Sequence, residues 1–162
     1  MKTSSPLKFI QSLSPDLYSF AYILIPDDLQ ATQLMIDSVA AFLIQKKSLL
    51  DKWTAKEESA FGEDLKVHLY KSMYDLSKKR YNQLRMSFKN IEDNSGFFSL
   101  DFDEKAALFL KERTDFREEL IEFILGKTRS ELLAFLYSAR IKMVTELPSI
   151  HRRMSDLQEV NN

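Results

Sequence analysis

Apolar side chains recur at three- and four-residue spacing along most of this chain, with polar side chains between them. Such spacing places the apolar groups on one face of a helix. The clearest case is the segment 28–47, whose apolar face is formed by Leu34, Ile36, Val39, Ala40 and Leu43. The chain has only 3 Gly and 4 Pro, and β folds need many such residues in their turns. The pattern predicts an all-α fold.

Three helices are predicted in the front part of the chain. Ser14, Pro15 and Asp16 fit an N-cap followed by proline at the first helical position, so a first helix should begin there and end near Ile25. A second helix should run from about residue 28 to residue 47. A third should cover residues 61–88, which gives a helical bundle.

Three shorter helices are predicted in the back part, each opened by a cap residue followed three positions later by a glutamate. The pairs are Asp101 with Glu104, Asp115 with Glu118, and Thr128 with Glu131. Both members of such a pair can bond exposed backbone N–H groups. Gly126 lies between the last two helices, where a C-cap is expected. Two short helices joined in this way have the plan of a helix-turn-helix.

The segment 89–96, KNIEDNSG, is polar and prone to turns, which favours a linker. We therefore expect an N-terminal helical bundle over 1–88, a linker over 89–100, a C-terminal helix-turn-helix domain over 101–147 and a fraying polar tail over 148–162.

Composition narrows the classes of function. The chain has no Cys, and its longest apolar run is far too short to cross a membrane, so the expected location is the cytoplasm. His68 and His151 lack a metal-ligand pattern, and neither a phosphate loop nor a nucleophile elbow occurs. We expect no cofactor, no metal and no enzymatic activity. Beyond Asn90, 10 Lys and Arg face 14 Asp and Glu, which disfavours phosphate binding by the back part.

The segment 110–143, LKERTDFREELIEFILGKTRSELLAFLYSARIKM, resembles the promoter-binding C-terminal domain of bacterial RNA polymerase sigma factors of the extracytoplasmic-function group. The matching positions are Leu110, Lys111, Glu112, Glu119, Ile121, Ile124, Leu125, Gly126, Leu132, Leu136, Ala139 and Arg140. The segment 17–37 is similar to the core-binding domain of that family, and 65–80 to its promoter-opening helix. The resemblance implies a dissociable subunit that binds core RNA polymerase and promoter DNA.

In the front part, the resemblance implies that Asp28, Gln33 and Asp37 bind polymerase. The alternative for each is an ordinary solvated helix position. On the third helix, one stripe combines basic and aromatic side chains that could hold phosphates and stack on unpaired bases. It consists of Tyr70, Lys71, Tyr74, Lys78, Tyr81 and Arg85. The alternative is an amphipathic helix whose tyrosines cover a neighbouring element.

In the back part, Lys127, Arg129 and Arg140 remain near enough to hold phosphates. The family tends to carry Lys, Ser, Arg and His where this chain has Leu133, Ala134, Phe135 and Tyr137, so hydrogen-bond donors for bases are lost. DNA binding by this domain should be poor. The face with Leu133, Phe135 and Tyr137 is expected to pack internally, and the alternative is that it binds a partner protein.

Two functions follow from these patterns. The leading one is a sigma-type transcription initiation protein that binds core RNA polymerase, and binds promoter DNA through its front domain, with a degraded recognition helix. The alternative is a sigma-derived protein-interaction module or regulator that no longer reads promoter DNA. A regulatory protein is a further expected partner, whereas a membrane is not.

Overall fold

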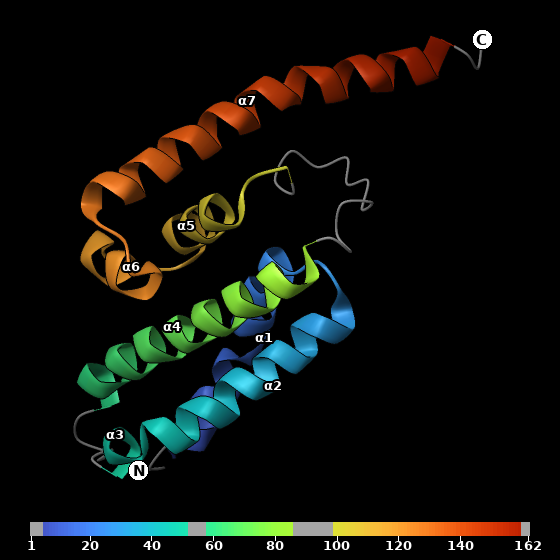
Figure 1. The fold of residues 1–162 in the computed structure, drawn as a ribbon. Coiled ribbons are helices and arrows are strands. Elements are labelled where there is room, and N and C mark those ends of the chain that lie inside the picture. Colours follow the sequence, from blue (N-terminus) through green and yellow to red (C-terminus); the bar gives the residue numbers. More distant parts are fainter. Residues whose placement is uncertain (1–4, 52–57, 86–98, 160–162) are drawn as a thin grey trace.

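The computed structural model describes residues 5–51, 58–85 and 99–159, and all the regular structure in these ranges is helical. This confirms the predicted all-α class. The helices, shown in Figure 1, are α1 (Pro6–Leu24), α2 (Asp28–Gln45), α3 (Lys47–Asp51), α4 (Glu58–Leu84), α5 (Phe102–Arg113), α6 (Glu118–Leu125) and α7 (Arg129–Glu159).

The first helix begins earlier than the sequence predicts. Ser5 is the N-cap of α1, its hydroxyl accepts a hydrogen bond from the backbone N–H of Lys8, and Pro6 takes the first helical position. Ser5-Pro6 is therefore the same start signal as Ser14-Pro15, nine residues upstream. The upstream signal prevails because the added turns bury Ile10 and Leu13. As a result, Pro15 lies inside α1.

Replacing Pro15 by alanine is expected to raise the free energy of unfolding by about 1–3 kcal/mol, because an interior proline removes one helical hydrogen bond and crowds the preceding turn. Pro15 is exposed, so the change leaves the core intact. Urea denaturation followed by circular dichroism measures the effect, with Pro6→Ala as the control at a position where proline is tolerated. An unchanged stability for Pro15→Ala would mean that the helix begins at Ser14 after all.

Most start and stop signals of the back part are confirmed. The Asp101 N–H donates to the Glu104 carboxylate at 3.0 Å, and the Thr128 N–H donates to the Glu131 carboxylate at 2.8 Å. Gly126 ends α6 in the left-handed conformation with φ of 60°. The prediction for Asp115 is wrong, because the N-cap of α6 is Arg117.

The last helix is longer than predicted. We expected the polar tail to fray after residue 147, yet α7 continues through this point to Glu159 and extends past the other helices toward the C-terminus (Figure 1). The proposed linker 89–100 lies almost entirely outside the described residues.

One hydrophobic core joins the front and back parts of the chain. In Figure 1, α4 lies between α1 and α2 on one side and α5 and α6 on the other, with α7 beyond α5 and α6. Phe20 of α1 packs against Phe109 of α5 with ring centroids 5.1 Å apart, and Tyr70 of α4 contacts Phe116 edge-on at 5.5 Å. The buried side chains of both parts form a single cluster. The two predicted domains are therefore packed together.

Candidate interaction surfaces

The tyrosine-rich stripe of α4 is largely covered. Tyr70 and Tyr74 are 1% and 2% exposed, and Tyr81 is half-buried with its ring 4.9 Å from that of Phe102 in α5. Since a base can stack only on an accessible ring, these tyrosines are not available to an unpaired DNA strand in this conformation. The predicted DNA-binding stripe is therefore not open. The alternative prediction, that the tyrosines cover a neighbouring element, agrees with the packing.

The polar groups of the stripe bond to the back part as well. The Tyr74 hydroxyl donates to the Asp103 carboxylate at 2.5 Å, and Lys78 Nζ lies 3.1 Å from the same oxygen. Burial, followed by this hydrogen bond, raises the pKa of Tyr74 far above its ordinary value. Because Asp103 belongs to α5, Lys78 and Tyr74 link α4 to α5. Lys71 instead pairs with Asp75 of the same helix at 3.5 Å.

Arg85 ends the stripe. Its side chain is exposed just beyond the end of α4, so it remains accessible to an anionic partner.

The three residues expected to bind polymerase lie between positions 28 and 37 of α2, and each has a hydrogen-bond partner within the molecule. The Tyr18 hydroxyl donates to Asp28 at 2.6 Å, and Gln33 Nε2 donates to Asp37 at 2.8 Å. Arg80 of α4 pairs with Asp37 at 2.8 Å. Hydrogen bonds from Arg80 and Gln33 hold the pKa of Asp37 below its ordinary value.

Near these polar groups, α2 also exposes three apolar side chains. Leu29 and Ile44 are 75% and 80% exposed, and Ile36 is also exposed. They lie seven and eight residues apart, which places them on one side of the helix. Ile36 was predicted on the apolar core face, and that assignment is wrong.

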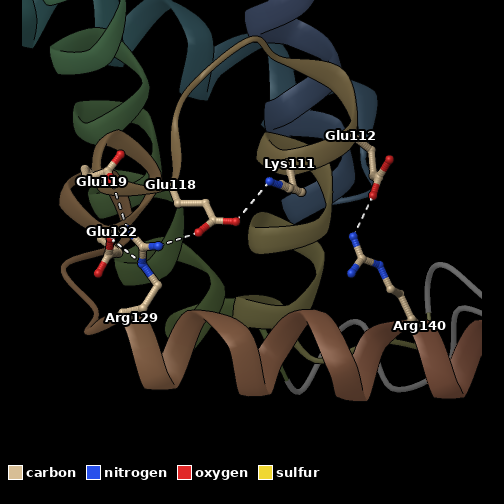
Figure 2. Close-up of polar contacts among 7 residues, drawn as sticks. All are labelled: Lys111, Glu112, Glu118, Glu119, Glu122, Arg129 and Arg140. Atoms are coloured by element: carbon tan, nitrogen blue, oxygen red, sulfur yellow. Dashed lines mark hydrogen bonds and ion pairs between the residues drawn. The ribbon is translucent and has the colours of Figure 1, made fainter.

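The cations of the helix-turn-helix are bound by carboxylates of the same unit (Figure 2). Arg129 at the start of α7 bonds Glu118 at 2.5 Å, Glu119 at 3.0 Å and Glu122 at 3.0 Å. Bonds to Glu122 and Glu119 raise the pKa of Arg129. Arg140 pairs with Glu112 at 3.0 Å. The Arg129 guanidinium, bonded through all three of its nitrogens, therefore has few N–H groups left for a phosphate, whereas Arg140 is bonded through one nitrogen.

The remaining predicted cation, Lys127, lies between α6 and α7. Its Nζ is 3.9 Å from the Asp103 carboxylate and 5.9 Å from the centre of the Phe135 ring. Lys127 therefore adds to the contacts within the back part.

The outer face of α7 exposes several apolar side chains. Leu133 and Tyr137 are 50% and 71% exposed, whereas Phe135 is half-buried. Internal packing of this face, which we favoured from the sequence, is therefore wrong for Leu133 and Tyr137. The sequence reasoning also missed Ile141 and Val144, which continue the exposed row at spacings of four and three residues. We call Leu133, Tyr137, Ile141 and Val144 the α7 apolar row.

Changing Glu118, Glu119 and Glu122 to glutamine should increase the affinity for duplex DNA roughly tenfold at low salt, because it frees Arg129 for one more phosphate contact and removes three negative charges. Fluorescence anisotropy with a labelled duplex at two salt concentrations measures the gain. The salt slope should steepen by about one unit.

The matched control removes three exposed carboxylates elsewhere, with the changes Asp16→Asn, Asp51→Asn and Glu63→Gln. It alters the net charge equally but leaves Arg129 bound. An equal gain in both variants would contradict a specific role for the three glutamates.

The class defined by these observations is an all-α protein with one continuous core and apolar rows exposed on α2 and α7. Comparison with known proteins places it no further: no family model, no curated protein and no solved structure matches the chain. In the part of the chain that the structure describes, every helix is too short or too polar to cross a membrane.

Proposed function

We propose that this protein is a protein-interaction module, related in plan to sigma factors, that does not read promoter DNA through its helix-turn-helix. The observation that carries the proposal is the α7 apolar row. It occupies the outer face of the helix that in a DNA-reading protein would carry donors for base edges.

The charges of the same unit support this proposal. Arg129 is bonded to three glutamates and Arg140 to one, so carboxylates of the same unit oppose both groups that could hold phosphates. An apolar protein surface, by contrast, can bury Leu133, Tyr137 and Ile141 without hydrogen bonds from these side chains. Proteins seldom expose several large apolar side chains on one side of a helix unless something covers them.

The test places a photo-crosslinking amino acid at Tyr137 in the cells that produce the protein. We expect crosslinking to one protein, and we expect it to decrease when Leu133, one turn away, is changed to glutamate. The matched control places the same crosslinker at Asn82, an exposed position of α4 outside the row. Crosslinks to DNA from position 137, or equal products from positions 137 and 82, would contradict the proposal.

A second candidate is a sigma-type initiation protein, favoured by the side chains of α2 between positions 28 and 37. Asp28, Gln33 and Asp37 lie there on a helix that also exposes Leu29 and Ile36, a mixed face of the kind that protein partners bind. This candidate rests on the resemblance to the core-binding domain of sigma factors.

Binding of the purified protein to core RNA polymerase tests this candidate. Reversing the charge at Asp37 should weaken binding if α2 contacts polymerase. Because the reversal also breaks the Asp37–Arg80 ion pair, Arg80→Gln is the control that breaks the pair without altering the face of α2. An equal loss in both variants, or no binding at micromolar protein, would count against this candidate.

A further inference from the structure

A hollow of about 520 Å³ lies between α1 and α5. Two helix faces form its walls. Tyr18, Ser19, Tyr22 and Ile23 come from α1, and Leu108, Phe109, Glu112 and Arg113 come from α5. The volume is in the range of sites that take small organic molecules.

The walls favour a flat aromatic group. The rings of Tyr18 and Tyr22 lie 6.2 Å apart at an interplanar angle of 26°, so they form one continuous aromatic wall. Phe109 on the opposite helix is held in place by Phe20 beneath it. A ring inserted between α1 and α5 would meet aromatic partners at offset or edge-to-face geometry.

The hollow has two charged residues in its lining, Glu112 and Arg113, and among the described residues only Glu112 has a partner of opposite charge. Glu112 is already paired with Arg140 at 3.0 Å (Figure 2). Arg113, the next residue, is exposed and forms no ion pair within the described chain. A guanidinium presents paired N–H donors that match the two oxygens of a carboxylate.

The geometry points to a binding site for an aromatic carboxylate, with the ring between Tyr22 and Phe109 and the carboxylate on Arg113. This site does not depend on the proposed function of the α7 apolar row. Because α1 belongs to the front part and α5 to the back part, a bound ligand would contact both parts at once.

Isothermal titration calorimetry with 2-naphthoate is the test, and 2-naphthalenemethanol is the uncharged probe of similar shape. We expect 2-naphthoate to bind in the micromolar range and the alcohol to bind more weakly. Arg113→Gln should weaken naphthoate binding about two- to fivefold, the range for a partly exposed ion pair, and leave binding of the alcohol unchanged. Ile23→Trp, which fills the hollow, should abolish binding of both.

The control for the added tryptophan is Leu29→Trp on the exposed face of α2, which should bind naphthoate as the unmodified protein does. Arg113 is exposed, so its variant tests the site even if Ile23→Trp fails to fold. The proposal is overturned if naphthoate does not bind at millimolar concentration. It is also overturned if Ile23→Trp folds and binds normally, or if Arg113→Gln binds naphthoate as tightly as the original chain.

Discussion

Truncating Phe109 to alanine is expected to lower the free energy of unfolding by about 3–5 kcal/mol, and to do so for the front and back parts together. Phe109 is 4% exposed and packs against Phe20 of α1. Its removal leaves a cavity at the boundary between the two parts. Urea denaturation gives the size of the loss, and hydrogen exchange of peptides from α1 and α7 shows whether both helices lose protection.

The control for this variant is Phe123→Ala on α6. It makes the same chemical change at a side chain that is 44% exposed, so the loss should be much smaller. If Phe109→Ala reduced protection in α7 and left α1 unchanged, the two parts would be independent domains, as the boundary at 89–100 predicts. A joint loss would mean that they unfold as one unit.

The outcome bears directly on the second functional candidate. A protein that opens promoter DNA with α4 would have to uncover Tyr70 and Tyr74. Uncovering them requires separating α4 from α5 and α6, which would also expose Phe116 and the polar groups that now bond Asp103. The energy of the shared core thus opposes promoter opening and favours a protein that works in the packed form.

The features that the sequence predicted well depend on short-range chemistry. The capping pair Asp101 and Glu104, and the left-handed Gly126, each involve residues within a few positions of one another. Their geometry depends mainly on the local backbone, which the sequence specifies directly. The start of α1 shows the limit of such signals, because two Ser-Pro pairs competed and burial of Ile10 selected between them.

The assignments that failed concern which face of a helix is covered. The period of α4 separates Tyr70 and Tyr74 from Leu69 and Met73, yet all four are buried because α4 has neighbours on both sides. Conversely, α7 has neighbours on one side only. Helical period identifies the two faces of an element, but the number of elements that pack on it is set by the tertiary fold.

The candidate surfaces show the same limit. The sequence showed that Glu118, Glu119 and Glu122 lie on one helix face and that their charges oppose phosphate binding by the back part. That all three bond Arg129 required the turn at Gly126, which brings residues seven to eleven positions apart together. The α7 apolar row was partly visible in the sequence as Leu133 and Tyr137, but its exposure was not.

Replacing Lys142 by methionine is expected to lower the free energy of unfolding by about 2 kcal/mol at neutral pH, because the buried Glu104 carboxylate loses its cation while Lys142 itself is 38% exposed and screened by solvent. Glu104 of α5 is 4% exposed, and Lys142 Nζ of α7 bonds its two oxygens at 2.8 and 3.0 Å. Ser138 also donates to this carboxylate at 2.6 Å. These bonds join α5 to α7 and set the position of the α7 apolar row.

The effect should depend on pH in a defined direction. Burial alone would raise the pKa of Glu104, but hydrogen bonds from Lys142, Ser138 and the Asp101 N–H outweigh it and lower the pKa below the ordinary value of 4.5. A carboxyl group with a lowered pKa stabilises the fold above its unfolded value, and this stability is lost as the pH falls through the folded value. The difference between Lys142→Met and the unmodified protein should therefore be largest near pH 7. It should shrink as the pH falls and Glu104 becomes protonated, first in the variant, which lacks the bond from Lys142, and last in the unmodified protein, at the lowered pKa of Glu104.

Urea denaturation at pH 7 and at pH 4 measures both the size of the effect and its direction. Lys79→Met is the matched control, because Lys79 is exposed on α4 and its loss should change stability by less than about 0.5 kcal/mol. A loss that is the same at both pH values would mean that Lys142 acts through the packing of its aliphatic stem. A loss that shrinks in acid would assign the effect to the ion pair that fixes α7 on α5, and hence to the element that presents the α7 apolar row to a partner.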